Sequence, residues 1–195
     1  EPARNDGDVD AAKQIATKFL DVTYEIPTLS HGQMEPLNFY ANVKDGKVEL
    51  FGPTQVPGAV RSEVSKELGI AEENITISSP RQGGGFGRKL MTDNGVEAAL
   101  ISAAAQSPVQ VQWTREDDMT QGPFRPGVSY RAEGAVNNGE ISAVKFRLCG
   151  QNIGHWMGSK KDVPNDSVLE GFQPSYFDSI KNISFSDVPF ETPIP

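Results

Sequence analysis

The stretch Ser78–Lys89, SSPRQGGGFGRK, contains four glycines, three of them consecutive, and regular elements are expected on both sides of it. Glycine enters positive φ at little cost and lets the backbone approach a ligand closely. Successive backbone N–H groups in such a turn form a concave site for anions. Phe86 interrupts the glycines, where a flexible linker would carry a serine. The stretch predicts a loop that holds a flat or anionic group, the alternative being a glycine-rich surface turn.

Two familiar phosphate loops are excluded by residue spacing. The sequence has no Walker string of Gly, four residues and Gly-Lys followed by Ser or Thr. A dinucleotide fingerprint counted from Gly83 needs a third Gly or Ala where Arg88 stands. The net charge of −8 argues against a nucleic-acid-binding face. It leaves open one local basic pocket, formed by Arg81, Arg88 and Lys89.

Periodicity and turn residues predict an α+β fold, a mixed β-sheet with hairpins and two main helices packed on it. The expected elements, in chain order, are a short helix capped by Asp8, a strand over 19–26, a hairpin over 39–52, a helix over 57–68, a strand at 75–77, a helix over 93–105, a strand over 109–113 and a hairpin over 128–148. Residues 1–149 are expected to form a regular core. Residues 150–195 are expected to be irregular apart from a strand at Ile183–Phe185.

Composition sets further bounds. A chain of 195 residues can bury one core or two small ones. Cys149 is the only cysteine, so no internal disulfide or all-cysteine metal site can form. No apolar run approaches the ~20 residues that a membrane helix needs. The chain does not begin with Met, and it is expected to be a segment of something longer.

Two candidate sites lie upstream of the glycine stretch. His31 and Glu35 have the spacing of metal ligands on one helix face, but Pro36 argues against a helix. The alternative is a polar pair that shapes a loop. Gln55 stands between Pro53 and Pro57, where a rigid side-chain amide could donate a hydrogen bond to an oxo or carbonyl group. Its alternative is a residue that points to water.

The remaining polar clusters favour structural interpretations. The charged run Arg115–Asp118 is expected to be a solvated loop. His155, Trp156 and Met157 could line a pocket, although a local cluster is the simpler interpretation. Ser30 and Ser175 have no evident His and acid partners, so the sequence does not support a hydrolytic triad.

Four stretches together resemble one family, namely His31–Pro36, Pro53–Pro57, Gly83–Lys89 and Pro108–Asp118. They are similar to the large, molybdopterin-binding subunit of the xanthine oxidase/aldehyde oxidoreductase family. The branch that they resemble most is typified by the beta subunit of isoquinoline 1-oxidoreductase, where the glycine motif also continues with two basic residues. The resemblance runs from about Gly7 to the end, so residues 1–195 are expected to be a partial molybdopterin-binding domain.

The resemblance implies a molybdenum hydroxylase, an oxidoreductase that inserts water-derived oxygen into a C–H bond of an aldehyde or N-heterocycle. Its cofactor would be molybdopterin, often in the cytosine dinucleotide form, whose dithiolene sulfurs ligate the molybdenum. The expected partners are the rest of the same large subunit and an iron–sulfur small subunit. Relatives of this branch can carry a twin-arginine export signal, so the bacterial periplasm is slightly favoured over the cytoplasm.

The resemblance also implies cofactor contacts at Gln55, Gly84, Gly85, Phe86, Gly87 and Arg88. Gln55 would face the apical oxo group of molybdenum, and Phe86 would lie beside the metal. The family's glutamate base lies outside this chain, and Glu35 is not assigned that role. The chain is therefore expected to form one wall of the site and to be inactive alone. The alternatives are a phosphate- or nucleotide-binding module built on the Gly83–Gly87 loop, and a scaffold that docks an electron-transfer partner through residues 150–195.

Overall fold

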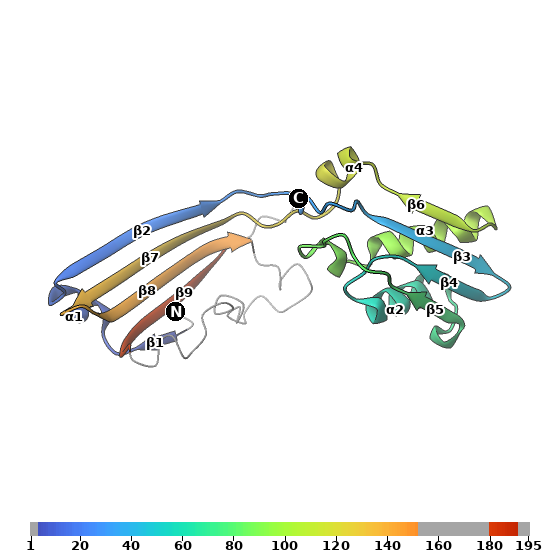
Figure 1. Cartoon of the computed structure of the whole chain (residues 1–195). Coiled ribbons are helices and arrows are strands. Elements are labelled where there is room, and N and C mark those ends of the chain that lie inside the picture. Colours follow the sequence, from blue (N-terminus) through green and yellow to red (C-terminus); the bar gives the residue numbers. More distant parts are fainter. Residues whose placement is uncertain (1–3, 152–179, 191–195) are drawn as a thin grey trace. The chain divides into compact units, whose positions relative to one another are not determined.

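The computed structural model describes residues 4–151 and 180–190 and divides the chain into two compact units (Figure 1). One unit comprises residues 30–123, and the other combines residues 1–29 with 124–195. Each unit has its own mixed β-sheet, and the α+β prediction is confirmed. The strands form two sheets rather than one because the strand that precedes residues 30–123 pairs with the strand that follows them.

The 30–123 unit is a four-stranded sheet with two helices. Its strands, in their order across the sheet, are β5 (Ile75–Ser78), β4 (Lys47–Phe51), β3 (Asn38–Lys44) and β6 (Val109–Gln112). The β4–β5 pair is parallel, and α2 (Pro57–Leu68) connects these two strands. The other main helix, α3 (Asp93–Ala105), connects β5 to β6. Both helices have the bounds expected from the sequence.

The core of this unit lies between the sheet and the two helices. The buried residues come from all of these elements and are Phe39, Ala41, Val48, Leu50, Val60, Val64, Ile75, Ala98 and Ala99. Gly95 on α3 allows the closest approach, since a Cβ there would lie 2.6 Å from Val60 Cγ1 on α2. The absence of a side chain at Gly95 therefore lets the two helices pack closely.

The glycine stretch connects β5 to α3 in this unit. It leaves the carboxyl end of β5, passes through the 3₁₀ turn η2 (Arg88–Leu90) and reaches the first turn of α3 at Asp93. The parallel β4–β5 pair ends beside it, where Gly52 N donates to Ser78 O at 3.2 Å. Ligands of open sheets with parallel strands characteristically bind at this edge.

The other unit is a five-stranded sheet with one short helix. Its strands, in their order across the sheet, are β1 (Arg4–Asp6), β9 (Asn182–Phe190), β8 (Glu140–Gln151), β7 (Val128–Asn137) and β2 (Lys18–Ile26). The helix α1 (Val9–Gln14) begins at Asp8, whose carboxylate accepts from Ala11 N at 2.9 Å, as expected. The β7–β8 hairpin turns at Asn138 and Gly139, both at positive φ.

The charged run after β6 differs from its prediction. Residues 115–120 form a helix, α4 (Arg115–Thr120), instead of a solvated loop. Thr114 and Asp117 form a reciprocal capping box at its start, and three acidic residues occupy its first turn. Asp118 is buried. Local capping therefore stabilises a helix in a run that was expected, from its charge, to be a solvated loop.

The expected strand at Ile183–Phe185 is confirmed as part of β9. His155, Trp156, Met157 and Ser175 lie outside the described residues. No helix in the described part of the chain is long and apolar enough to span a membrane.

We predict that Gly95→Val lowers the free energy of unfolding by about 1–3 kcal/mol, because the added methyl groups overpack against the buried Val60. Denaturant titration of the 195-residue chain measures this change. Gly58→Ala on α2 is the matched control, since its Cβ meets nothing within 4 Å. It should stabilise by about 0.4–1 kcal/mol. Equal stability for Gly95→Val and the unsubstituted chain would contradict this account of the packing.

Candidate functional site

The backbone of the glycine stretch takes the conformations that its sequence predicts. Gly84 and Gly87 have φ values of +93° and +97°. Phe86 also has positive φ, at +50°, and its side chain is 61% exposed. A non-glycine residue in this region is uncommon and costs of order 1–3 kcal/mol, so surrounding contacts must hold it there. The loop presents an aromatic ring and bare backbone at the surface of the unit.

Gln55 lies directly against this loop. A Cβ on Gly85 would lie 2.7 Å from Gln55 Oε1, so only a glycine permits this approach. Backbone contacts fix the two segments, since Gln55 N donates to Lys89 O at 2.9 Å. The Gln82 side chain also donates to Thr54 O at 2.6 Å. The structure therefore brings together Gln55 and Gly85, which the sequence singled out separately.

Arg88 and Lys89 do not form the local basic pocket that the sequence left open. Arg88 is buried, donates to both carboxylate oxygens of Asp93 at 2.9 and 2.5 Å, and lies 5.6 Å from the centre of the Trp113 ring. The Lys89 side chain is fully buried and ion-paired with Glu35. Their charges are neutralised within the unit because buried cations require partners. The assignment of Arg88 as a cofactor contact stays a prediction.

Glu35 is a site residue whose role the sequence did not reveal. Its Oε2 accepts from Lys89 Nζ at 2.7 Å and from Gly83 N at 2.8 Å. Its own backbone N–H donates to Gly83 O at 3.1 Å. A Cβ on Gly83 would lie 2.5 Å from Glu35 Cβ, which explains the first glycine of the run. Glu35 therefore clamps the start of the loop and the lysine that follows it.

Among the residues that the structure describes, His31 and Glu35 are not part of a larger metal-ligand cluster. No group of three or more His, Cys, Asp or Glu side chains suited to a metal occurs within the described ranges. The His31 ring lies near the loop, at 3.7 Å from the position of a Cβ on Gly87. Glu35 shapes the loop through Lys89 and Gly83, and the expected pairing of Glu35 with His31 stays a prediction.

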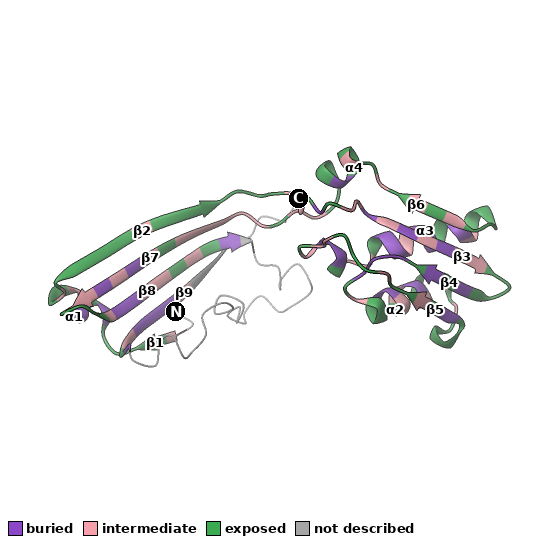
Figure 2. Cartoon of the chain, in the orientation of Figure 1, coloured by how far each residue is buried: buried purple, intermediate pink, exposed green. Residues whose placement is uncertain are grey.

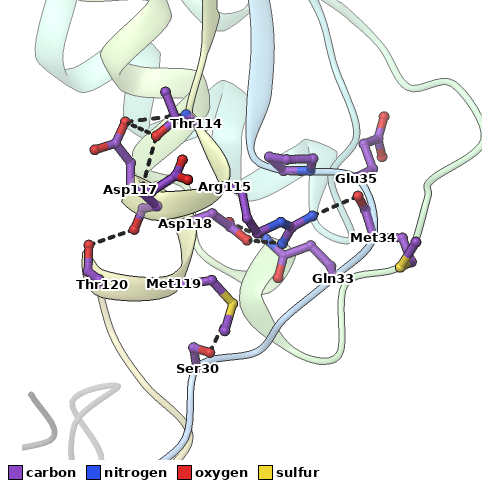
Figure 3. A network of polar contacts seen from close by, with 12 residues as sticks. Ser30, Gln33, Met34, Glu35, Thr114, Arg115, Asp117, Asp118, Met119 and Thr120 are labelled. Carbon is purple, nitrogen blue, oxygen red and sulfur yellow. Dashed lines mark hydrogen bonds and ion pairs between the residues drawn. The ribbon is translucent and has the colours of Figure 1, made fainter.

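The segment that carries Glu35 is held in turn by α4 (Figure 3). Gln33 Nε2 donates to Asp118 Oδ1 at 2.5 Å, and the Asp118 side chain is fully buried. Arg115 donates to Asp118 Oδ2 at 3.0 Å and to Met34 O at 2.7 Å. The sequence signal for this anchor was the spacing of Thr114 and Asp117, which is that of a capping box. The charged run thus holds the loop at 31–36 in place through its hydrogen bonds to Gln33 and Met34.

The environment of Glu35 changes its acidity. Partial burial disfavours the charged form, but hydrogen bonds from Lys89 and Gly83 outweigh it and hold the pKa of Glu35 below its ordinary value of 4.5. A carboxyl with a lowered folded-state pKa stabilises the fold above its unfolded-state pKa. This contribution is lost as pH falls through the folded-state pKa.

Comparison with known proteins identifies the family of this arrangement. The family described as "Molybdopterin cofactor-binding domain" matches residues 2–186. The chain is 38% identical over 160 residues to isoquinoline 1-oxidoreductase subunit beta from Brevundimonas diminuta, covering 82% of this chain and 18% of the relative. It is 33% identical over 154 residues to the aldehyde oxidoreductase molybdenum-binding subunit PaoC of Escherichia coli (strain K12), covering 78% and 21%.

A solved structure shows the same fold. The aldehyde oxidoreductase from Desulfovibrio desulfuricans ATCC 27774 superposes with a TM-score of 0.73 at 16% identity, covering 96% of this chain and 21% of that one. The chain spans about a fifth of the length of the curated relatives that it matches. The family match supports the interpretation of the chain as part of a molybdopterin-binding domain and not the nucleotide-binding alternative. The six individual cofactor contacts stay predictions.

We predict that Glu35→Gln lowers stability near neutral pH by roughly 2–4 kcal/mol, because it leaves the buried Lys89 ammonium without a counter-charge. The stability difference from the unsubstituted chain should be largest above the ordinary pKa of 4.5 and shrink as pH falls below it. Denaturant titrations of the 195-residue chain across this pH range measure the effect.

Two variants control this experiment. Glu63→Gln removes an exposed ion pair with Lys66 on α2 and should change stability by less than about 1 kcal/mol. The double variant Glu35→Gln/Lys89→Met removes the unpaired ammonium and should recover part of the loss. A Glu35→Gln deficit that persists unchanged at low pH would show that the ion pair is not its origin.

Proposed function

The chain belongs to the molybdopterin cofactor-binding domain family, and we propose that Gln55 and the Gly83–Gly87 loop form one wall of the cofactor site in a molybdenum hydroxylase. The contact between Gln55 and Gly85 carries this proposal. It joins the two motifs that the family resemblance assigns to the cofactor, which are 30 positions apart in the sequence.

The described residues fit such a group. A Cβ at Gly85 would occupy the space next to Gln55 Oε1, so the glycine leaves room for a close approach. Within the described ranges, the Gln55 side-chain amide has no hydrogen-bond partner, which leaves its N–H group available to a ligand. Phe86 adds an exposed flat ring beside the backbone of the loop. A donor, bare backbone and an aromatic surface thus lie together.

The residues of this chain hold and orient rather than react. When bound, molybdopterin would supply the redox-active molybdenum that accepts the substrate's electrons. Gln55 would donate a hydrogen bond to the cofactor, and Phe86 would shield it from water. A donor that is fixed before reaction needs no reorganisation during it, which is the basis of electrostatic preorganisation. The contacts of Glu35 and Lys89 keep the loop in this geometry.

The finer features of the proposal come from the resemblance and from the named relatives. The relatives include aldehyde oxidoreductase and isoquinoline 1-oxidoreductase subunits, which supports an aldehyde or N-heterocycle as the substrate. We propose the cytosine dinucleotide form of the cofactor, and as partners the rest of the large subunit and an iron–sulfur small subunit. The catalytic base would lie outside residues 1–195, so this chain alone would be inactive.

We predict that Gly85→Ala, made in the full-length subunit, removes most of its molybdenum and pterin, because the new methyl group fills the space that the glycine leaves for close approach of the cofactor to the backbone. Elemental analysis and the pterin nucleotide released on denaturation measure this loss. The stability of the 195-residue chain should change by less than about 1 kcal/mol, since Gln55 is exposed and can move. Gly58→Ala, remote from the loop, should keep full loading. A fully loaded Gly85→Ala subunit would refute the proposed cofactor wall.

We predict that Gln55→Ala retains molybdenum but lowers kcat by about 10²-fold, the typical cost of losing one preorganised donor. Turnover of aldehydes and N-heterocycles by the purified complex, normalised to molybdenum content, measures this effect. Gln82→Ala provides a comparison, because its amide binds Thr54 O instead of facing a ligand. Unchanged turnover for Gln55→Ala would remove Gln55 from the site.

A further inference from the structure

An unusual edge strand borders the sheet of the 1–29 and 124–195 unit. Among the described strands, β2 pairs only with β7, and none of its nine residues is buried (Figure 2). Leu20, Tyr24 and Ile26 are 59%, 60% and 48% exposed. Exposed edge strands usually carry charge or proline against association, so three large apolar side chains here need an explanation.

These apolar side chains share one face of the sheet. Successive side chains alternate between the two faces of a strand, which places Leu20, Val22, Tyr24 and Ile26 together. Their directly paired positions on β7 share the same face, and these are Gly134, Ala132, Tyr130 and Val128. From Leu20 to Ile26 on β2 and their partners on β7, this face therefore has no charged side chain, and Lys18 lies on it only at the start of β2.

The opposite face has the contrary character. Arg131 on β7 pairs with Asp21 on β2 at 2.6 Å, and Lys13 from α1 pairs with Glu133 at 2.5 Å. Thr23 lies opposite Arg131 on this face. Although α1 packs on this second face at Ala135 and Ala143, the face is charged between Asp21 and Glu133, and such a contrast between two faces is typical of a sheet whose apolar face is covered.

The apolar face continues into an existing core. Toward β8 and β9 it includes Val144, Ile183 and Phe185, all buried, and Phe146 stacks on Phe185 at 5.4 Å between ring centres. The β2–β7 part of this face thus continues the hydrophobic core, but its large apolar side chains on β2 are exposed. Solvent-exposed apolar surface of this kind characteristically marks an interface.

We propose that the β2–β7 apolar face is the docking surface for the remainder of the full-length molybdenum-binding subunit. The chain spans about a fifth of the length of its relatives, which leaves most of such a subunit to supply the cover. A face that has no charge from Leu20 to Ile26 and that continues a core resembles an obligate interface, which is like a domain core cut in two. The remainder of the subunit is favoured over a separate iron–sulfur subunit or a second copy of this chain, because the relatives carry the additional length within the same polypeptide.

Cysteine labelling tests this proposal. Tyr24→Cys and, one position away on the polar face, Thr23→Cys are each made in a Cys149→Ser background, because Cys149 is exposed. Maleimide modification of each site is followed by peptide mass spectrometry. In the 195-residue chain both sites should react at similar rates. In the full-length subunit without its small subunit, Tyr24→Cys should react about tenfold or more slowly than Thr23→Cys.

Every other outcome overturns the proposal. Equal rates in the full-length subunit would show that the face stays in water. Protection of Tyr24→Cys in a dimer of the 195-residue chain would identify a second copy as the occupant, and protection in its monomer would identify the chain itself. Protection that requires the small subunit would identify a separate partner. Leu20→Cys repeats the test at a second position. The labelling needs no bound cofactor, so its failure is distinguishable from failure of the proposed cofactor site.

Discussion

The ion pair between Lys89 and Glu35 is the constraint on which the candidate site depends. A fully buried ammonium requires an opposite charge, and only Glu35, from a segment more than 50 positions away, is seen to supply it among the described residues. The same carboxylate oxygen accepts the Gly83 N–H, so one group fixes both ends of the glycine run. A loop with φ near +90° at two glycines and +50° at a phenylalanine would otherwise have many conformations.

The constraint extends outward in two directions. Toward α4, the Glu35 segment is held by Gln33 and Arg115, which both bind the buried Asp118. Toward α3, Arg88 joins the loop to Asp93 and to the face of Trp113. These hydrogen bonds and ion pairs neutralise charges that, from the sequence alone, were compatible with a basic pocket and with a solvated run. Much of the polarity around the glycine loop therefore maintains its shape, and Gln55 and Phe86 remain as the exposed groups that can meet a cofactor.

The two units of the chain use hydrophobic patterning differently. In the 30–123 unit, both helices and the sheet bury their apolar faces against one another, with Gly95 permitting contact near Val60. In the other unit, the apolar face is buried at β8 and β9 but exposed at β2 and β7. Alternation along a strand states which face is apolar, but the same alternation occurs whether that face meets a helix, another sheet or a different part of the subunit.

The sequence by itself determined the motifs and most of the elements, although not the helix α4. Local signals such as the Asp8 cap, the Gly69 helix end and the turns at Asp45-Gly46 and Asn138-Gly139 act within a few residues, and they placed helices and strands correctly. The glycine run and Gln55 were also found separately in the sequence. Only the tertiary structure decided that β2 pairs with β7, that Gln55 meets Gly85, and that Glu35 neutralises Lys89. These contacts join positions 30 to over 100 residues apart, where the partner of a charge or strand is chosen by burial and chain topology.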